Sequence, residues 1–351
     1  MNRLARNEKT QPKTKKETMA SVMKRGLFAF VLMSGLAAGK AETAFAQSFP
    51  NMPVHIVVPF AAGGPADLIA RIFSQQMAKD LGQPVIVENI GGAGGTIATT
   101  RVANAEPDGY TLVMSGNSTH SAALAFYDDL RYDPVKDFKS VGTMSTNAEV
   151  IIARKNFPPN NLKELIAYLK QNGAKVNNGH GGVGSISYSA CVIFNTLVGA
   201  NPTLIAYRGV GPATVDMIAG VVDYVCDQVP SAMGRIRDKS VKAYVVTTAE
   251  RQAAIPDVPT ANEAGIPQYK IDVWYGLSAP KGTPDAVIGR LNKALRFAQD
   301  EPSLRKRIAE LGGEIPSDAD RTPKHLDDII QNDLRLWVPM LAEARKKLEK
   351  K

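Results

Sequence analysis

Residues 57–67 read VVPFAAGGPAD: an apolar run typical of a buried strand, a glycine-rich turn and the expected start of a helix. A second stretch of this kind, NIGGAGG, follows at residues 89–95. Such turns leave backbone N–H groups without partners, and the positive end of a helix dipole lies behind them. Two of these turns in succession predict a site for a carboxylate or a phosphate.

On both sides of these turns, apolar runs alternate with helical patterns, which favours an α/β fold. The runs expected to form strands lie at 54–58, 84–88, 110–114, 149–153, 203–207, 221–225, 241–246 and 274–280. Helices are expected at 65–81, 162–170, 284–298, 302–311 and 323–348. A further helix is expected to begin after Ser185, which is a good N-cap residue. The polar loop at 115–120 follows a predicted strand, and ligands bind at such carboxyl ends in open α/β sheets.

The net charge of +8 is concentrated at the N-terminus. Residues 1–46 contain nine Lys or Arg and three Asp or Glu, so this segment carries +6 and the rest of the chain only +2. A basic isoelectric point that comes from one terminal segment gives no support to nucleic-acid binding by the folded part.

The same N-terminal segment has the pattern of a secretory signal peptide. Lys24 and Arg25 precede an apolar run at 26–38, and Ala44-Phe45-Ala46 offers small residues for cleavage after Ala46. The run is shorter than the roughly 20 residues that span a bilayer, which disfavours the alternative of a retained anchor. We therefore expect residues 1–46 to be removed and the mature protein to be exported to the periplasm. The translation start stays open between Met1, Met19 and Met23.

Cys191 and Cys226 are the only two cysteines. In an oxidising compartment an isolated pair is a disulfide candidate, and two buried thiols are the alternative. Closing this loop would stabilise the fold by roughly 3–4 kcal/mol in the chain-entropy model.

No motif of the common enzyme classes occurs in the predicted context that its chemistry requires. No G-x-G-x-x-G follows a predicted strand, and no phosphate-binding G-x-x-x-x-G-K-[ST] occurs. His180-Gly181-Gly182 lacks the G-x-S-x-G motif that would make it part of a hydrolase site. The four histidines, His55, His120, His180 and His325, have no metal-ligand spacing. We therefore expect neither catalysis nor a cofactor or metal.

Six motifs, in order along the chain, resemble the Bug family, the periplasmic solute-binding proteins of tripartite tricarboxylate transporters. They are VPFAAGGPADLIAR (58–71), VENIGGAGGTIATTRVANAEPDGYTL (87–112), GVGSISYSA (182–190), AYRGVGPATVDMIAGVVDYVCDQ (206–228), IPDVPTANEAG (255–265) and WYGLSAPKGTPDAVIGRLNKAL (274–295). Together they cover the predicted mature chain.

The resemblance implies a two-lobed periplasmic-binding-protein fold of the Venus-flytrap type (type II). Each lobe would be a mostly parallel sheet flanked by helices, and the chain would cross twice between the lobes. Lobe 1 would comprise residues 48–147 and 272–351, and lobe 2 residues 148–271. A monomer is expected.

The resemblance also implies that backbone N–H groups and waters, rather than an arginine, hold a ligand carboxylate. The contacts are expected from the first glycine turn, the loop after the third strand, a helix start in lobe 2 and a strand end. The residues at these positions are Phe60, Ala61, Ala62, Gly63, Gly64, Asn117, Ser118, Thr119, His120, Gly184, Ser185 and Asp227. Tyr188 and Arg208 stand where the family usually has His and Lys, which leaves the ligand's identity open.

Several of these residues also have structural interpretations. Asp67 is more simply placed to cap the N–H groups of its own helix than to contact a ligand, and a lone His120 in a loop is more often structural. Phe60 could pack beneath the turn, although the resemblance favours its covering the ligand. Asp227 is expected at the cleft, with either a ligand amino or hydroxyl group or a helix N-terminus as its partner.

The predicted function is an extracytoplasmic receptor that captures a small organic carboxylate between hinged lobes and delivers it to membrane permease subunits. Di- and tricarboxylates, acidic amino acids and aromatic acids all suit the predicted site. The main alternative is a carboxylate receptor that reports to a membrane sensor, and a secreted hydrolase is a third possibility.

Overall fold

The computed structural model describes residues 49–349, and the part from Pro50 onward is one compact unit. The predicted signal peptide and its cleavage site lie outside the described residues. Among the helices that are described, none combines the length and the apolar character needed to cross a membrane.

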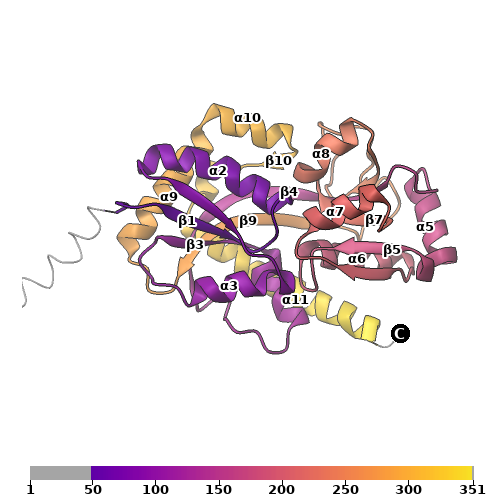
Figure 1. Cartoon of the computed structure of the whole chain (residues 1–351), viewed down its shortest axis with the longest axis horizontal. Helices are drawn as coiled ribbons and strands as arrows, with labels where there is room; N and C mark the ends of the chain where they lie inside the picture. Colours follow the sequence, from indigo (N-terminus) through magenta and orange to yellow (C-terminus); the bar gives the residue numbers. More distant parts are fainter. Residues whose placement is uncertain (1–48, 350–351) are drawn as a thin grey trace, which may run out of the picture. The chain divides into compact units, whose positions relative to one another are not determined.

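Strands and helices alternate along the chain (Figure 1). The first part contains β1 (Val54–Val58), α2 (Pro65–Leu81), β2 (Val85–Asn89), η1 (Ala93–Gly95), α3 (Thr96–Ala103), β3 (Thr111–Gly116), η2 (Ser118–Ala122), α4 (Ala123–Phe126) and β4 (Phe138–Arg154). The middle part contains α5 (Leu162–Asn172), η3 (Gly173–Lys175), β5 (Asn177–His180), α6 (Ile186–Val198), β6 (Thr203–Ala206), α7 (Val210–Ala219), β7 (Tyr224–Gln228), α8 (Val229–Arg237) and β8 (Val241–Val246). The last part contains β9 (Asp272–Pro280), α9 (Asp285–Asp300), α10 (Pro302–Glu310), β10 (Gly313–Glu314), η4 (Asp318–Asp320) and α11 (Pro323–Glu349).

The described strands belong to one continuous sheet with the order β2-β1-β3-β9-β4-β7-β5-β6, and β8 and β10 also pair with β4. β2, β1 and β3 run parallel, as do β7, β5 and β6, whereas β9 and β4 run antiparallel to their neighbours. Helix α2 packs on β1 and β2 and against α9, which packs on β4, and α6 and α7 pack on β5 and β7. The result is the two-lobed α/β fold that the resemblance implies.

The 17-residue strand β4 joins the two groups of strands. Its first part, residues 138–148, pairs with β9, and from Glu149 onward it pairs with β7 and β8. The sequence predicts a strand only at 149–153, because the polar residues before it interrupt the apolar run. The change of partners puts Glu149 at the junction of the two groups.

Local sequence signals explain the limits of several helices. α2 begins at Pro65 and ends at Gly82, whose φ of 68° lets its N–H donate to the carbonyl of Ala78. Ser185 caps α6, because its side chain accepts a hydrogen bond from the N–H of Tyr188. All three predicted limits, the start and end of α2 and the start of α6, are confirmed.

Other segments also differ from the prediction. The strand expected at 221–225 is β7 at Tyr224–Gln228, because α7 ends at the left-handed Gly220 and the chain turns before the strand begins. The strand β5 has no counterpart among the predicted strands, and its polar residues form a strand because β6 and β7 pair with it on both sides. It leads into a G-x-G-x-x-G pattern at 179–184, so one such pattern does follow a strand.

Cys191 of α6 and Cys226 of β7 form a disulfide, with a Cα–Cα distance of 5.6 Å. Both residues are fully buried. The bond therefore ties together a helix that begins, and a strand that ends, at the cavity described next.

Candidate functional site

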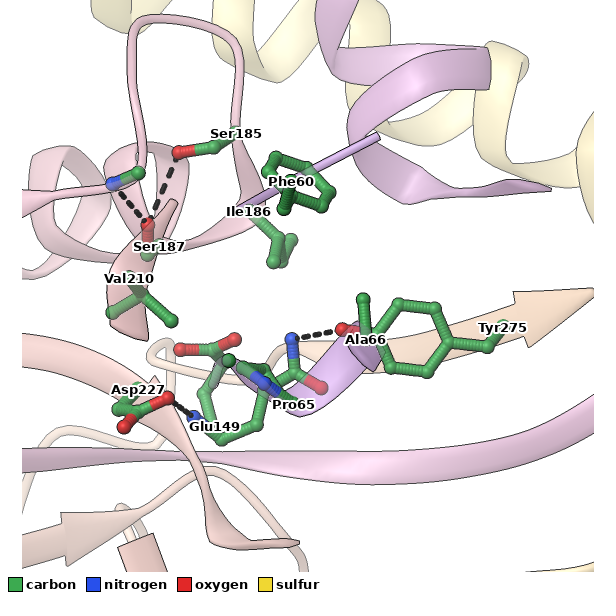
Figure 2. Close-up of a pocket in the computed structure, with 13 residues that line it drawn as sticks. Phe60, Pro65, Ala66, Glu149, Ser185, Ile186, Ser187, Val210, Asp227 and Tyr275 are labelled. Carbon is green, nitrogen blue, oxygen red and sulfur yellow. Dashed lines mark hydrogen bonds between the residues drawn. The ribbon is translucent and has the colours of Figure 1, made fainter. Parts of the chain in front are cut away.

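A cavity of about 340 Å³, counted with the space at its mouth, lies where the two groups of strands meet (Figure 2). Its walls come from the first glycine turn, from β4, β7 and β9, and from the starts of α6 and α7. The lining residues are Phe60, Gly64, Pro65, Ala66, Glu149, Gly181, Ser185, Ile186, Ser187, Val210, Asp227, Gln228 and Tyr275.

Four helices begin at this cavity. Pro65 opens α2, Ile186 opens α6 and Val210 opens α7, while Gln228 precedes α8. The N-terminal amides of a helix have no acceptors within it, and α2 and α7 have no side-chain cap either. None of the residues that line the cavity is Arg, Lys or His. Aligned backbone dipoles are therefore the source of positive potential for an anion here.

The first glycine turn contributes Phe60 and Gly64 to the cavity, whereas its intervening amides are used elsewhere. The N–H of Ala61 donates to the carbonyl of Arg208 at 3.0 Å, and that of Gly63 to the carboxylate of Asp67 at 3.1 Å. Ala61, Ala62 and Gly63 do not line the cavity. Because α2 begins immediately after this turn, its first residues, Pro65 and Ala66, line the cavity instead.

Asp67 has a structural role, but it bonds to the first turn and not, as was expected, to the N–H groups of its own helix. It accepts hydrogen bonds from the N–H of Gly63 and from the guanidinium of Arg71 at 2.9 Å. Burial works to raise the pKa of Asp67, but Arg71, Gly63 and Asn89 outweigh it and lower the pKa. The carboxylate is thus ionised and already satisfied.

The second glycine turn packs against the other strand group instead of lining the cavity. A Cβ atom on Gly91 would lie 2.3 Å from the carbonyl oxygen of Arg208, and one on Gly94 would lie 2.0 Å from that of Val183. No side chain fits at such distances. We call this contact, between residues 91–94 and the carbonyls of Val183 and Arg208, the glycine seam.

The segment after β3 is buried and makes contacts within the protein. Ser118 accepts a hydrogen bond from the N–H of Ile186 at 2.8 Å, so its side chain satisfies one N-terminal amide of α6. Asn117 donates to the carboxylate of Asp333 at 2.8 Å and to the carbonyl of Asp272. Neither residue lines the cavity, because these partners turn both side chains into the protein.

Thr119 and His120 are likewise placed away from the cavity. Thr119 bonds to the backbone of Gly116 and to the Nδ1 atom of His120, at 2.9 Å. Burial lowers the pKa of His120 to about 3, so the ring is neutral. It packs against Phe138 and Trp274, as expected of a structural histidine.

In the middle part of the chain, Ser185 and Asp227 line the cavity and Gly184 does not. Gly184 faces the ring of Tyr127, where a Cβ atom would lie 2.9 Å from the ring. Asp227 accepts hydrogen bonds from the N–H of Gln228 at 2.8 Å, from Ser231 at 2.6 Å and from Thr214 at 3.3 Å. The N-terminus of α8, one of its two predicted partners, therefore contacts Asp227.

Glu149 lines the cavity but was missed by sequence analysis, which treated it only as the start of a strand. It is fully buried, and neither carboxyl oxygen has a hydrogen-bond partner among the described residues. Burial, aided by the nearby charge of Asp227, raises the pKa of Glu149 well above its usual value. An acidic residue opening an otherwise apolar buried strand was the available signal.

The remaining residues that sequence analysis missed complete the cavity wall. Gln228 donates from Nε2 to the hydroxyl of Tyr275 at 2.8 Å, which links β7 to β9 across the junction. Ile186 and Val210 supply apolar surface, while Ser187 accepts a hydrogen bond from the N–H of Gly181. These residues meet only through tertiary contacts.

Two strand groups joined by a crossing strand, with helix N-termini at a cavity where they meet, are the architecture of a two-lobed binding protein. The family model of the tripartite tricarboxylate transporter family receptor, TctC, matches residues 69–344. The chain belongs to this family.

Solved structures and sequence relatives agree with this assignment. The chain is 43% identical to MatC (Rpa3494) from Rhodopseudomonas palustris with bound malate, covering 84% of this chain and all of that one, with a TM-score of 0.81. It is 38% identical to the periplasmic binding protein BugD, covering 84% and 98%, with a TM-score of 0.82. Among sequence relatives, BugT of Bordetella pertussis is 31% identical over 89% of this chain and 95% of its own length.

Proposed function

We propose that this protein is a periplasmic receptor that binds a small organic carboxylate in the cavity and delivers it to the membrane subunits of a tripartite transporter. It performs no chemistry on the ligand. The family assignment supports this role, as do the solved relatives with bound malate and, at 27% identity, bound adipate. Signal-peptide cleavage after Ala46 and a monomeric state belong to the same proposal.

One observation carries the proposal: helix N-termini converge on a cavity that no cationic side chain lines. Such a site attracts an anion through backbone N–H groups and helix dipoles. Phe60, Ile186 and Val210 offer apolar surface to the carbon skeleton.

Closure of two lobes around the ligand is part of the proposal. We assign residues 48–147 and 272–351 to lobe 1 and residues 148–271 to lobe 2, so that β4 crosses between the lobes beside Glu149. The glycine seam and the hydrogen bond from Ala61 to Arg208 would then hold the closed form. A ligand that touches both lobes favours this form by hinge closure.

Thermal unfolding of the purified mature protein against a panel of organic acids tests the proposal. A ligand at 100 times its Kd stabilises the folded state by about 2.7 kcal/mol, so the melting temperature should rise with ligand concentration. Native mass spectrometry should detect a co-purified acid. If no mono-, di- or tricarboxylate raises the melting temperature, the proposed function is wrong.

A further inference from the structure

The cavity contains hydrogen-bond acceptors that no described residue uses. Both carboxyl oxygens of Glu149 and the Oε1 atom of Gln228 lack partners in the described part of the chain. The two side chains are 0% and 2% exposed, and both line the cavity. An unpaired buried polar atom is costly, so these acceptors point to a ligand that donates hydrogen bonds to them.

The groups around Glu149 do not provide that donor. Asp227, from β7, adds negative charge and already accepts three hydrogen bonds of its own. The hydroxyl of Thr247 accepts from the backbone N–H of Glu149 and donates to the carbonyl of Ile271. From β9, Tyr275 accepts from Gln228, and the buried Tyr269 has its hydroxyl beside Cys226. Among these neighbours, none is cationic.

We propose that the ligand carries a hydroxyl or ammonium group beside its carboxylate and that Glu149 is the specificity-determining residue that binds this group. The inference rests on the proposed function and narrows its ligand to hydroxy acids and amino acids. The carboxylate lies at the helix N-termini, while the donor group pairs with Glu149 and with Oε1 of Gln228. An unsubstituted acid leaves these acceptors unpaired and binds more weakly.

The pH dependence of binding separates the two donors. An ammonium group pairs with ionised Glu149, whose pKa is raised in the free protein. The affinity of an amino acid therefore rises with pH. It stops rising above the pKa of Glu149 in the ligand-free protein, where the carboxyl is already ionised. A hydroxyl group also donates to the protonated carboxyl, so the affinity of a hydroxy acid changes less over the same range.

Matched acids that differ by one substituent test the inference by titration calorimetry. The series are propionate, lactate and alanine; succinate, malate and aspartate; and glutarate, 2-hydroxyglutarate and glutamate. In at least one series the substituted acid should bind roughly 10- to 100-fold more tightly than the unsubstituted acid, the range expected for a charge-assisted hydrogen bond.

Three variants assign the preference to Glu149. Glu149→Met removes the acceptor and should abolish the preference for either substituent, while binding of the unsubstituted acid persists. Glu149→Gln keeps a neutral acceptor and should abolish only a preference for ammonium. Glu314→Gln, at an exposed position of β10, is the matched control and should behave as the wild type.

Two results overturn the inference without touching the proposed function: unsubstituted acids that bind as tightly as substituted ones, or a Glu149→Met variant that keeps the preference. Absence of binding by every acid in the panel would instead overturn the proposed function, and the inference with it.

Discussion

At the scale of single residues, burial decides what each carboxylate at the cavity does. Asp227 is satisfied by the N-terminus of α8 and by two hydroxyl groups, whereas Glu149 has no partner among the described residues. The two carboxylates lie on neighbouring strands and repel each other, which contributes to the raised pKa of Glu149. Asp227 therefore has a structural role, and Glu149 is available to a ligand.

Glu149 makes the stability of the ligand-free protein depend on pH. Its pKa in the folded state lies above the usual value of 4.5, so the folded state binds more protons than the unfolded state between those two values. The free energy of unfolding should fall as pH rises from about 4.5 towards the folded-state pKa. Glu149→Gln removes this dependence, so its stability relative to the wild type should increase with pH in urea unfolding. If the difference in free energy of unfolding between Glu149→Gln and the wild type is constant with pH, the raised pKa does not belong to Glu149. The control is Glu314→Gln, which should show no such change with pH relative to the wild type.

At the scale of elements, the glycine turns illustrate how one sequence pattern serves two purposes. The first turn leads into α2, whose N-terminus lines the cavity, while the second turn forms the glycine seam. Gly91 has room for no side chain because two backbone groups, the carbonyl of Arg208 and the N–H of Ala61, lie against it. The seam thus lets the two backbones approach directly.

Gly91→Ala should weaken carboxylate binding by opening the seam. The new Cβ atom would lie 2.3 Å from the carbonyl oxygen of Arg208, which cannot move without separating the two strand groups. We expect at least a tenfold loss of affinity, about 1.4 kcal/mol, in calorimetry with the best acid. The control is Gly289→Ala in α9, where no atom lies within 4 Å of the added Cβ. Unchanged affinity in Gly91→Ala would show that the seam has no role in binding.

The disulfide also links two elements, because Cys191 lies in α6 and Cys226 in β7. It holds the helix that begins at the cavity against the strand that ends there. Replacing both Cys191 and Cys226 with Ala should lower the free energy of unfolding by about 2–5 kcal/mol, the usual loss for a native disulfide. Chemical denaturation measures this change. Ligand affinity should also fall, because Ser185 and Asp227 lie on the two linked elements. Full stability of the double variant would contradict a structural role for the bond.

At the scale of the whole molecule, β4 and β9 couple the two groups of strands to the cavity. β4 changes partners at Glu149, and β9 carries Tyr275, which is hydrogen-bonded to Gln228 of β7. A ligand that contacts both sides stabilises their closed arrangement, whereas a ligand that contacts one side does not.

Lobe closure can be measured by small-angle X-ray scattering of the mature protein. The radius of gyration should decrease when a saturating acid is added to ligand-free protein, and Gly91→Ala should show a smaller decrease. An acid that raises the melting temperature but leaves the radius of gyration unchanged would contradict hinge closure while preserving the binding function.

The predictable part of the site is the part built from consecutive residues. Pro65 after two glycines marks the start of α2, and Ser185 marks the start of α6, so both helix N-termini were identified from local signals. His120 and Asn117 were expected at the site because they follow a strand. The structure turns both inward, since Trp274 packs on His120 and Asp333 accepts from Asn117, and both partners are more than 150 residues away in sequence.

The sequence by itself determined the α/β class, the order of most strands and helices and the anion-attracting helix starts, because propensity, capping and periodicity act between near neighbours. Only the tertiary structure decided that residues 91–94 form a seam and that Glu149 faces a cavity without a partner. These features depend on contacts between segments that are far apart in the sequence. Such contacts form when the backbone packs, so no local sequence pattern predicts them.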